Sequence, residues 1–269
     1  MKRTPPARRA AFTLIELVVV LLILAAIAGL VIPQVGMLGR TTDMAVSAKT
    51  QADLASNIQL FFVLQKRYPN QLDSLLDTTQ AGYAPVTPFP SGDAQTFGLP
   101  VSGADGAWMG FTDNGTTLAQ LTTAQLTSGQ ARSITRSGIA GIYDHATTGN
   151  ANNSANTLRA VASGEEVAVV QTGRALETKL VPNIANETGF ILVAFGIGPR
   201  NSAISKTLTN CPTYPGCDGK YYGRYIAVFK VYESGERATL AGVVDAYGRT
   251  PDYTQLQFNE SLPDGGRQG

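Results

Sequence analysis

The chain has 269 residues, of which 43% are hydrophobic and 15% are charged, and its formal net charge is +1. Such a length can bury a proper core, and the near-neutral charge excludes the overall basic character typical of nucleic-acid-binding proteins. His145 is the only histidine, which argues against histidine-based catalysis and multi-histidine metal sites. No enzyme activity, metal or cofactor is therefore expected.

The first 33 residues combine a basic leader with a long apolar stretch. Four basic residues precede Phe12, and a helix from Phe12 to Ile32 would be about 31 Å long, enough to cross a bilayer. Glu16 is the exception in this stretch, because an ionisable side chain inside such a span costs about 2.5 to 3.5 kcal/mol. The positive-inside rule keeps the leader in the cytoplasm and places the residues after Pro33 outside.

Two ordinary interpretations of this segment leave Glu16 unexplained. A secretory signal peptide would have a small-residue cleavage site at residues 26–28. A single-span anchor would merely tolerate the acid near the membrane edge. The apolar run continues past Ala28 without the polar break expected at a signal cleavage site, so neither interpretation is favoured.

Residues 11–17, Ala-Phe-Thr-Leu-Ile-Glu-Leu, resemble the processing site of type IV pilins and of the pseudopilins of type II secretion. In these families a membrane peptidase cuts before the phenylalanine and methylates the new amino terminus, so the resemblance implies processing between Ala11 and Phe12. An acid at the fifth mature position, Glu16, and a proline at the end of the span, Pro33, match in register. Ala11 stands where the families usually have glycine.

The resemblance also assigns a role in assembly to Glu16. In the family this acid attracts the amino terminus of the neighbouring subunit, and a desolvated pair of this kind penalises misregistration more than it adds stability. The implied partners are prepilin peptidase, other pilin or pseudopilin subunits, an inner-membrane assembly platform and, before assembly, membrane lipid. From Phe12 onward the chain has 17 basic and 20 acidic residues and no basic cluster, so no nucleic-acid partner is expected.

The resemblance implies four parts along the chain. Residues 1–11 would be a cleaved leader and residues 12–33 the transmembrane and assembly helix, which Pro33 is predicted to kink. No proline follows until Pro69, so residues 34–68 are predicted to be the soluble half of the long helix. Apolar residues recur at helical spacing from Leu54 to Leu64, and we expect this part to pack on its own sheet.

Residues 69–269 are predicted to form a globular, pilin-like β domain. A Tyr-Pro turn at its start is similar to the turn that follows the long helix in many pseudopilins. β-branched and aromatic residues predict strands in four runs, at 166–171, 189–196, 224–232 and 237–244. The predicted fold class is α+β, with the long helix packed on an antiparallel sheet.

Residues from about 80 to 165 are rich in Gly, Thr, Ser and Asn and poor in charges and large apolar side chains. This composition predicts a loop-rich insertion with short strands, exposed on the filament surface or at its tip. A short helix is expected at residues 118–126.

Cys211 and Cys217 are the two cysteines, and the five residues between them favour a loop. In an oxidising envelope this spacing predicts a disulfide that staples a turn, with free thiols as the alternative. Zinc is not predicted, because no histidine is near and a structural zinc site needs four ligands.

Together these features predict a structural subunit of a type II secretion or type IV pilus filament. The chain would sit in the inner membrane by one N-terminal span, with its domain in the periplasm or outside, and then enter a pilus or pseudopilus. Its bulk fits a minor or specialised subunit better than a major one. Two alternatives stay open: a tip adhesin or sensor pilin, and a membrane-anchored envelope protein with an enzymatic activity.

Overall fold

A computed structural model describes residues 14–77, 84–85, 112–113, 116–117, 121–145, 157–170, 175–182, 186–214, 223–245, 248 and 250–252. The chain divides into two compact units, residues 1–42 and 43–269, and the boundary lies within the first helix.

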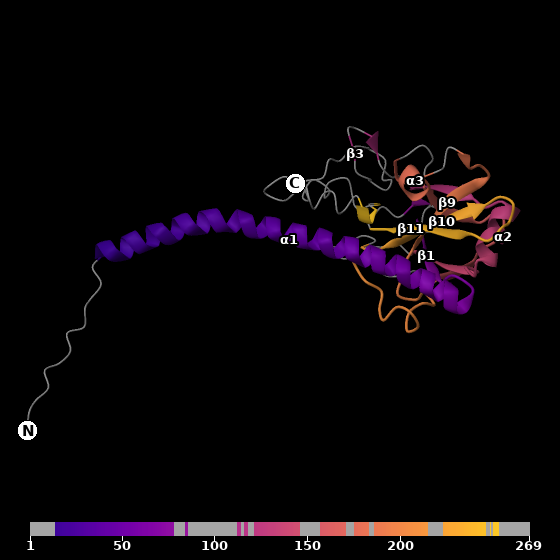
Figure 1. Ribbon diagram of the computed structural model, residues 1–269, viewed down its shortest axis with the longest axis horizontal. Coiled ribbons are helices and arrows are strands. Elements are labelled where there is room, and N and C mark those ends of the chain that lie inside the picture. Colours follow the sequence, from indigo (N-terminus) through magenta and orange to yellow (C-terminus); the bar gives the residue numbers. More distant parts are fainter. Residues whose placement is uncertain are drawn as a thin grey trace, which may run out of the picture. The chain divides into compact units, whose positions relative to one another are not determined.

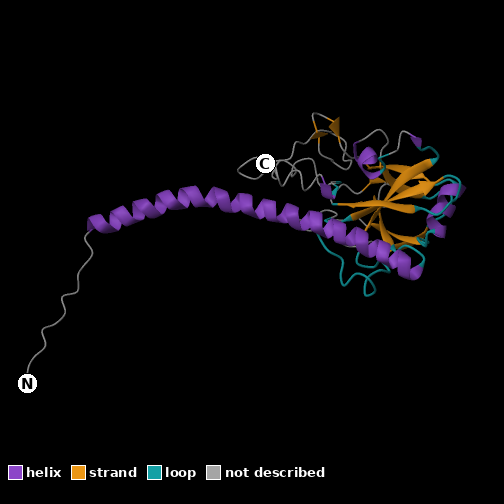
Figure 2. Cartoon of the chain, viewed as in Figure 1, coloured by secondary structure: helices purple, strands orange, loops and turns teal. Residues whose placement is uncertain are grey.

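Three helices and eleven strands lie in the described residues (Figures 1 and 2). The helices are α1 (Leu14–Gln65), α2 (Ser128–Arg136) and α3 (Ala175–Leu180). The strands are β1 (Leu72–Asp77), β2 (Ala84–Pro85), β3 (Thr112–Asp113), β4 (Thr116–Thr117), β5 (Leu121–Gln125), β6 (Gly141–His145), β7 (Thr157–Ala160), β8 (Glu166–Val170), β9 (Phe190–Gly196), β10 (Ile226–Tyr232) and β11 (Thr239–Val244).

The long helix α1 ends close to where the sequence predicts, before Pro69. Lys66 has φ of 56°, in the left-handed region, and its amide donates to the carbonyl of Phe62 at 2.8 Å. This is a left-handed helix cap. The chain then turns sharply, and Asn70 fastens the turn because its Oδ1 accepts hydrogen bonds from the amides of Ala140 and Gly141, each at 2.9 Å.

The C-terminal part of α1 buries one face against the sheet. Leu54, Ile58 and Phe61 are at most 2% exposed and belong to one core cluster with residues of β9 and β10. Their i, i+4, i+7 spacing places them on one side of a helix. The prediction that this part of the helix packs on its own sheet is confirmed.

The sheet is mixed rather than antiparallel. Its main path runs β11-β10-β9-β1-β6-β7, with β2 paired to β1 and with β8 joining β5 to β9. The four strands predicted in the second half of the sequence correspond to β8, β9, β10 and β11, which form antiparallel pairs. However, β1 and β6 are parallel, with Leu72 opposite Ile142. The antiparallel prediction is wrong here, because a long crossover through β5 and α2 joins β1 to β6 in place of a hairpin.

Both faces of the sheet are covered. In β9, Val193 and Phe195 belong to the cluster that contains the α1 residues, whereas Leu192 and Ala194 belong to a second cluster on the opposite face. Side chains alternate between the faces of a strand, so a strand buried on both sides reads as a continuous apolar run. The second cluster includes Val181, which directly follows α3.

The region interpreted as a loop-rich insertion supplies α2, β5, β6 and β7 to this domain. Ile134, Ile139 and Ile142 are fully buried in the main core cluster, so the part of the region that contains them is not an exposed insertion. The helix expected at residues 118–126 is wrong, because β5 occupies most of it and pairs with β8. Tertiary pairing with a strongly apolar strand outweighs local preference there.

Helix α2 begins after a capping box. The Thr127 hydroxyl accepts from the Gln130 amide at 3.2 Å, while the Gln130 side chain accepts from the Thr127 amide at 2.9 Å. Ser133 then docks the helix on the β10–β11 hairpin, because its Oγ accepts from the Tyr232 amide and its carbonyl accepts from the Ala238 amide, each at 3.1 Å.

Candidate functional site

The N-terminal part of α1 exposes many large apolar side chains. Between Leu14 and Ile27 the exposed fraction of these side chains ranges from 43% at Val18 to 81% at Leu14. Burying one such side chain stabilises a protein or complex by about 1.5–3 kcal/mol. A contiguous exposed surface of this kind marks a region that binds a partner or an apolar phase.

Glu16 lies in the first turn of α1 and is exposed. The exposed apolar neighbours Ile15 and Leu17 flank it.

The remaining predicted residues of this segment are only partly covered. Ala11 and Phe12, the predicted cleavage and methylation positions, lie outside the described residues. Pro33 lies within α1, which is assigned as helix on both sides of it, and the kink stays a prediction. Among the residues that the structure describes, no helix is long and apolar enough to cross a membrane.

Cys211 lies in the loop before β10 and has no disulfide partner among the residues that the structure describes. Its Sγ lies 2.7 Å from the carbonyl oxygen of Ile197, to which it donates, and Nη1 of Arg224 lies 3.4 Å from Sγ. Burial raises the pKa of the Cys211 thiol to about 11, although the nearby Arg224 acts in the opposite direction. Cys217 lies outside the described residues, so the disulfide stays a prediction.

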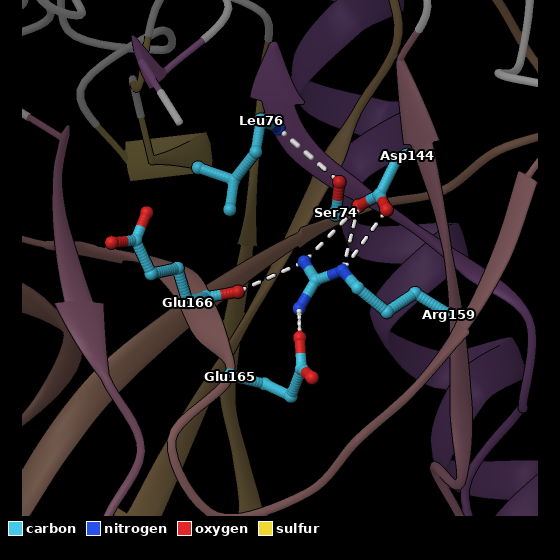
Figure 3. Close-up of polar contacts among 6 residues, drawn as sticks. All are labelled: Ser74, Leu76, Asp144, Arg159, Glu165 and Glu166. Atoms are coloured by element: carbon cyan, nitrogen blue, oxygen red, sulfur yellow. Dashed lines mark hydrogen bonds and ion pairs between the residues drawn. The ribbon is translucent and has the colours of Figure 1, made fainter. Parts of the chain in front are cut away.

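A polar cluster surrounds Arg159 on β7 (Figure 3). Its Nε lies 2.9 Å from Oδ2 of Asp144, its Nη1 lies 2.8 Å from Oε2 of Glu165, and its Nη2 donates to the backbone carbonyl of Glu166 at 2.9 Å. Burial by itself lowers the pKa of Arg159, but the hydrogen bonds that it donates to the carboxylates of Asp144 and Glu165 raise this pKa above its ordinary value overall.

This cluster ties an edge strand to its neighbours. Strand β7 ends the main path of the sheet, and Arg159 connects it to Asp144 on β6 and to the turn that leads into β8. Both nearby carboxylates are engaged by the guanidinium, which suits a structural ion pair better than proton transfer. The sequence did not indicate this cluster, because its members are brought together only by the β6–β7 pairing.

The described part of the chain is thus an α+β domain preceded by a long helix whose N-terminal apolar side chains are exposed. The comparison with protein families adds a further observation. Residues 6–32 match the family model of the prokaryotic N-terminal methylation motif. No curated protein and no solved structure is significantly similar to the chain.

The match confirms the resemblance of the N-terminal segment to type IV pilins and pseudopilins. It includes Ala11, Phe12, Glu16 and all but the final proline of the apolar stretch. The motif supports a pilin-like subunit, and it implies processing by a prepilin peptidase and assembly with other pilin subunits. It covers only the N-terminal segment, so it says nothing of the domain that follows.

Proposed function

We propose that this chain is a structural subunit of a type II secretion or type IV pilus filament, in a minor or specialised role. The observation that carries the proposal is the coincidence of the methylation motif at residues 6–32 with the exposed apolar side chains from Leu14 to Ile27. A segment with this chemistry can serve first as a membrane anchor and then as the packing surface of a helical assembly.

In this proposal the chain is cut between Ala11 and Phe12, and the new amino terminus is methylated. Cleavage removes the four basic residues of the leader and leaves an amine beside an apolar segment. An amine buried without a partner is costly, and the carboxylate of Glu16 offsets that cost when the two groups meet in the assembled state. The domain from residue 43 onward lies in the periplasm or outside the cell.

The proposal is tested with Glu16→Ala in cells that assemble the filament. The variant should be processed and membrane-inserted as the wild type is, but recovered poorly in the sheared filament fraction. Asp252→Ala, which removes an exposed acid outside the apolar segment, is the matched control and should assemble normally. Normal assembly of Glu16→Ala would show that Glu16 has no role in filament assembly.

A further inference from the structure

The C-terminal end of α1, helix α2 and the loop of the β10–β11 hairpin lie together at one end of the domain (Figure 1). The amide of Tyr68, just after α1, donates to the carbonyl of Ser137 at the end of α2, and the amide of Ala238 in the hairpin donates to the carbonyl of Ser133. Four exposed arginines come from these three segments, and we call them the arginine cluster: Arg67, Arg132, Arg136 and Arg237.

The two arginines of α2 lie on Gly235 in the hairpin loop. A Cβ atom added at Gly235 would come 2.8 Å from Cδ of Arg132, and Nη1 of Arg136 donates to the Gly235 carbonyl at 3.1 Å. Gly235 is itself buried, whereas both arginines are exposed. The side chains of Arg132 and Arg136 thus meet over the loop that also carries Arg237.

A second glycine, Gly138, brings Arg67 to the C-terminal end of α2. A Cβ atom added at Gly138 would come 2.5 Å from Cβ of Arg67, and Gly138 follows Arg136 by two residues. Gly138 and Gly235 have φ of 106° and 78°, in the left-handed region that favours glycine, and neither carries a Cβ atom that would push an arginine away. Contacts of this kind reduce the freedom that arginine side chains lose when they bind a ligand.

No acid neutralises the arginine cluster in the described part of the chain. None of the four arginines forms an ion pair there, although Glu233 and Glu236 are exposed in the hairpin loop. A guanidinium group has five N–H donors, and Arg136 uses one of them on Gly235. The other three arginines donate no hydrogen bond to a described residue, so most of the donors can reach a ligand.

The stability of α2 does not explain the arginine cluster. Arg132 and Arg136 are four residues apart on one helix, and like charges at this spacing are destabilising. The helix dipole favours a cation in the last turn, which accounts for Arg136. Arg132 lies before that turn and Arg237 lies in the hairpin, so the dipole accounts for neither. A bound anion would relieve the repulsion.

The chemistry of the guanidinium group indicates the kind of anion. Its planar fork donates two parallel hydrogen bonds to the oxygen atoms of a phosphate or a carboxylate. The carboxylates of Glu233 and Glu236 lie in the same loop and pair with none of the four arginines. A ligand with two or more phosphate groups carries more charge than a carboxylate, and it can bind arginines from several segments at once.

We propose that the arginine cluster is a binding site for a ligand with two or more phosphate groups. These phosphates belong to a soluble polyphosphate or to the headgroup of an anionic lipid such as cardiolipin. A nucleic acid is a poorer match, because the chain from Phe12 onward has 17 basic and 20 acidic residues and would repel a long polyanion beyond the cluster.

The test measures the binding of tripolyphosphate to the full chain in a neutral detergent at low salt, by isothermal titration calorimetry. Arg132→Gln/Arg136→Gln should weaken binding by about tenfold or more, because it removes two of the four guanidinium groups. Lys49→Gln/Lys179→Gln removes two exposed cations outside the cluster and is the matched control, which should bind as the wild type does. Arg132→Lys/Arg136→Lys keeps the charges but loses the forks, and its affinity should lie between the two.

Several results would overturn the inference. These are no binding of tripolyphosphate at about 1 mM, equal losses in the two glutamine variants, or wild-type affinity in the lysine variant, which would show a non-specific cationic surface. Tighter binding of a short DNA duplex than of tripolyphosphate, at equal phosphate concentration, would also overturn it. Urea unfolding of each variant checks that a loss of binding is not a loss of the fold.

Lipid nanodiscs distinguish the two sources of phosphate. The wild type and Arg132→Gln/Arg136→Gln are titrated with tripolyphosphate in discs of phosphatidylcholine and in discs that also contain cardiolipin. If the headgroup binds the cluster, cardiolipin competes with tripolyphosphate and weakens its binding more in the wild type than in the variant. If the ligand is soluble, cardiolipin changes both affinities equally. Either result supports a phosphate site.

The inference is independent of the proposed function, because no residue of the arginine cluster lies within the methylation motif at residues 6–32. Glu16→Ala should bind tripolyphosphate as the wild type does. Arg132→Gln/Arg136→Gln should still be processed at its N-terminus, so each proposal can fail without the other.

Discussion

The guanidinium of Arg159 holds the carboxylate of Asp144 in a bidentate ion pair, with Nε 2.9 Å from Oδ2 and Nη2 3.1 Å from Oδ1. The two side chains are 11% and 5% exposed. The pair joins the edge strand β7 to β6, and β6 is in turn the parallel neighbour of β1. It therefore secures the part of the sheet that the sequence did not predict.

Removing one member of this pair should be costly. Asp144→Ala leaves the Arg159 guanidinium buried without its bidentate partner and should lower the free energy of unfolding by about 3–5 kcal/mol. The double variant Asp144→Leu/Arg159→Met removes both charges and should lose much less. Urea unfolding of the full chain, followed by circular dichroism, measures the difference. Asp53→Ala, at an exposed acid of α1, is the control and should lose little stability. An equally small loss in Asp144→Ala would contradict the structural role of the ion pair.

The Cys211 thiol should be poorly reactive at neutral pH. Since burial raises its pKa from 9.0 to about 11, the reactive thiolate should be about 100-fold scarcer at pH 8 than for an ordinary thiol. In Cys217→Ser, where no disulfide can form between the two cysteines, alkylation by iodoacetamide should be slow at pH 8 and accelerate up to about pH 11. A rate at pH 8 equal to that in denaturing urea would show that the thiol is not buried.

The raised pKa of Cys211 also determines how the free energy of unfolding of Cys217→Ser changes with pH. The native state holds its proton more tightly than the unfolded state, so the contribution of Cys211 is fully present below pH 9. It falls as the pH rises from 9 towards 11, because the unfolded thiol ionises first. Urea unfolding at pH 8 and pH 10.5, with Cys211→Ala/Cys217→Ser as the reference, separates this effect from other titrations.

Asn70 should stabilise the turn after α1 through its acceptor oxygen. Asn70→Ala leaves the amides of Ala140 and Gly141 without that acceptor and should cost about 1–3 kcal/mol. Asn70→Asp keeps an acceptor oxygen in place and should cost less. Thermal unfolding of the two variants and the wild type measures these losses of stability. Equal losses would show that the side-chain oxygen does not stabilise the turn.

Gly129 allows α2 to lie against the β10–β11 hairpin. A methyl group there would overlap the backbone carbonyl of Glu233, which cannot move as a side chain can. Gly129→Ala should therefore destabilise the domain by about 1–3 kcal/mol. Gly141→Ala is the control, since its methyl group would meet chiefly the partly exposed side chain of Leu158. Equal stability of the two variants would contradict close packing at Gly129.

The sequence predicted elements whose signal is local. The strands β8 to β11 are β-branched and aromatic runs bounded by turns, and the end of α1 is marked by the proline that follows it. The face formed by Leu54, Ile58 and Phe61 follows from helical spacing. These features depend on neighbouring residues, so they can be recognised without knowledge of the fold.

Features that depend on distant pairing could not be predicted. The parallel pairing of β1 with β6 joins residues 72–77 to residues 141–145, which lie far apart in the sequence. Arg159 and Asp144 likewise become a pair only when β7 lies beside β6.

The most direct test of the central claim is mass spectrometry of the N-terminal peptide of the mature protein, purified from cells that contain a prepilin peptidase. The account predicts a peptide that begins with N-methylated Phe12 and retains Glu16. A mature terminus after Ala28 would instead show removal of a signal peptide, and an intact leader with Ala11 still joined to Phe12 would show that the motif is not processed. Either of these results would contradict the assignment of this chain as a filament subunit.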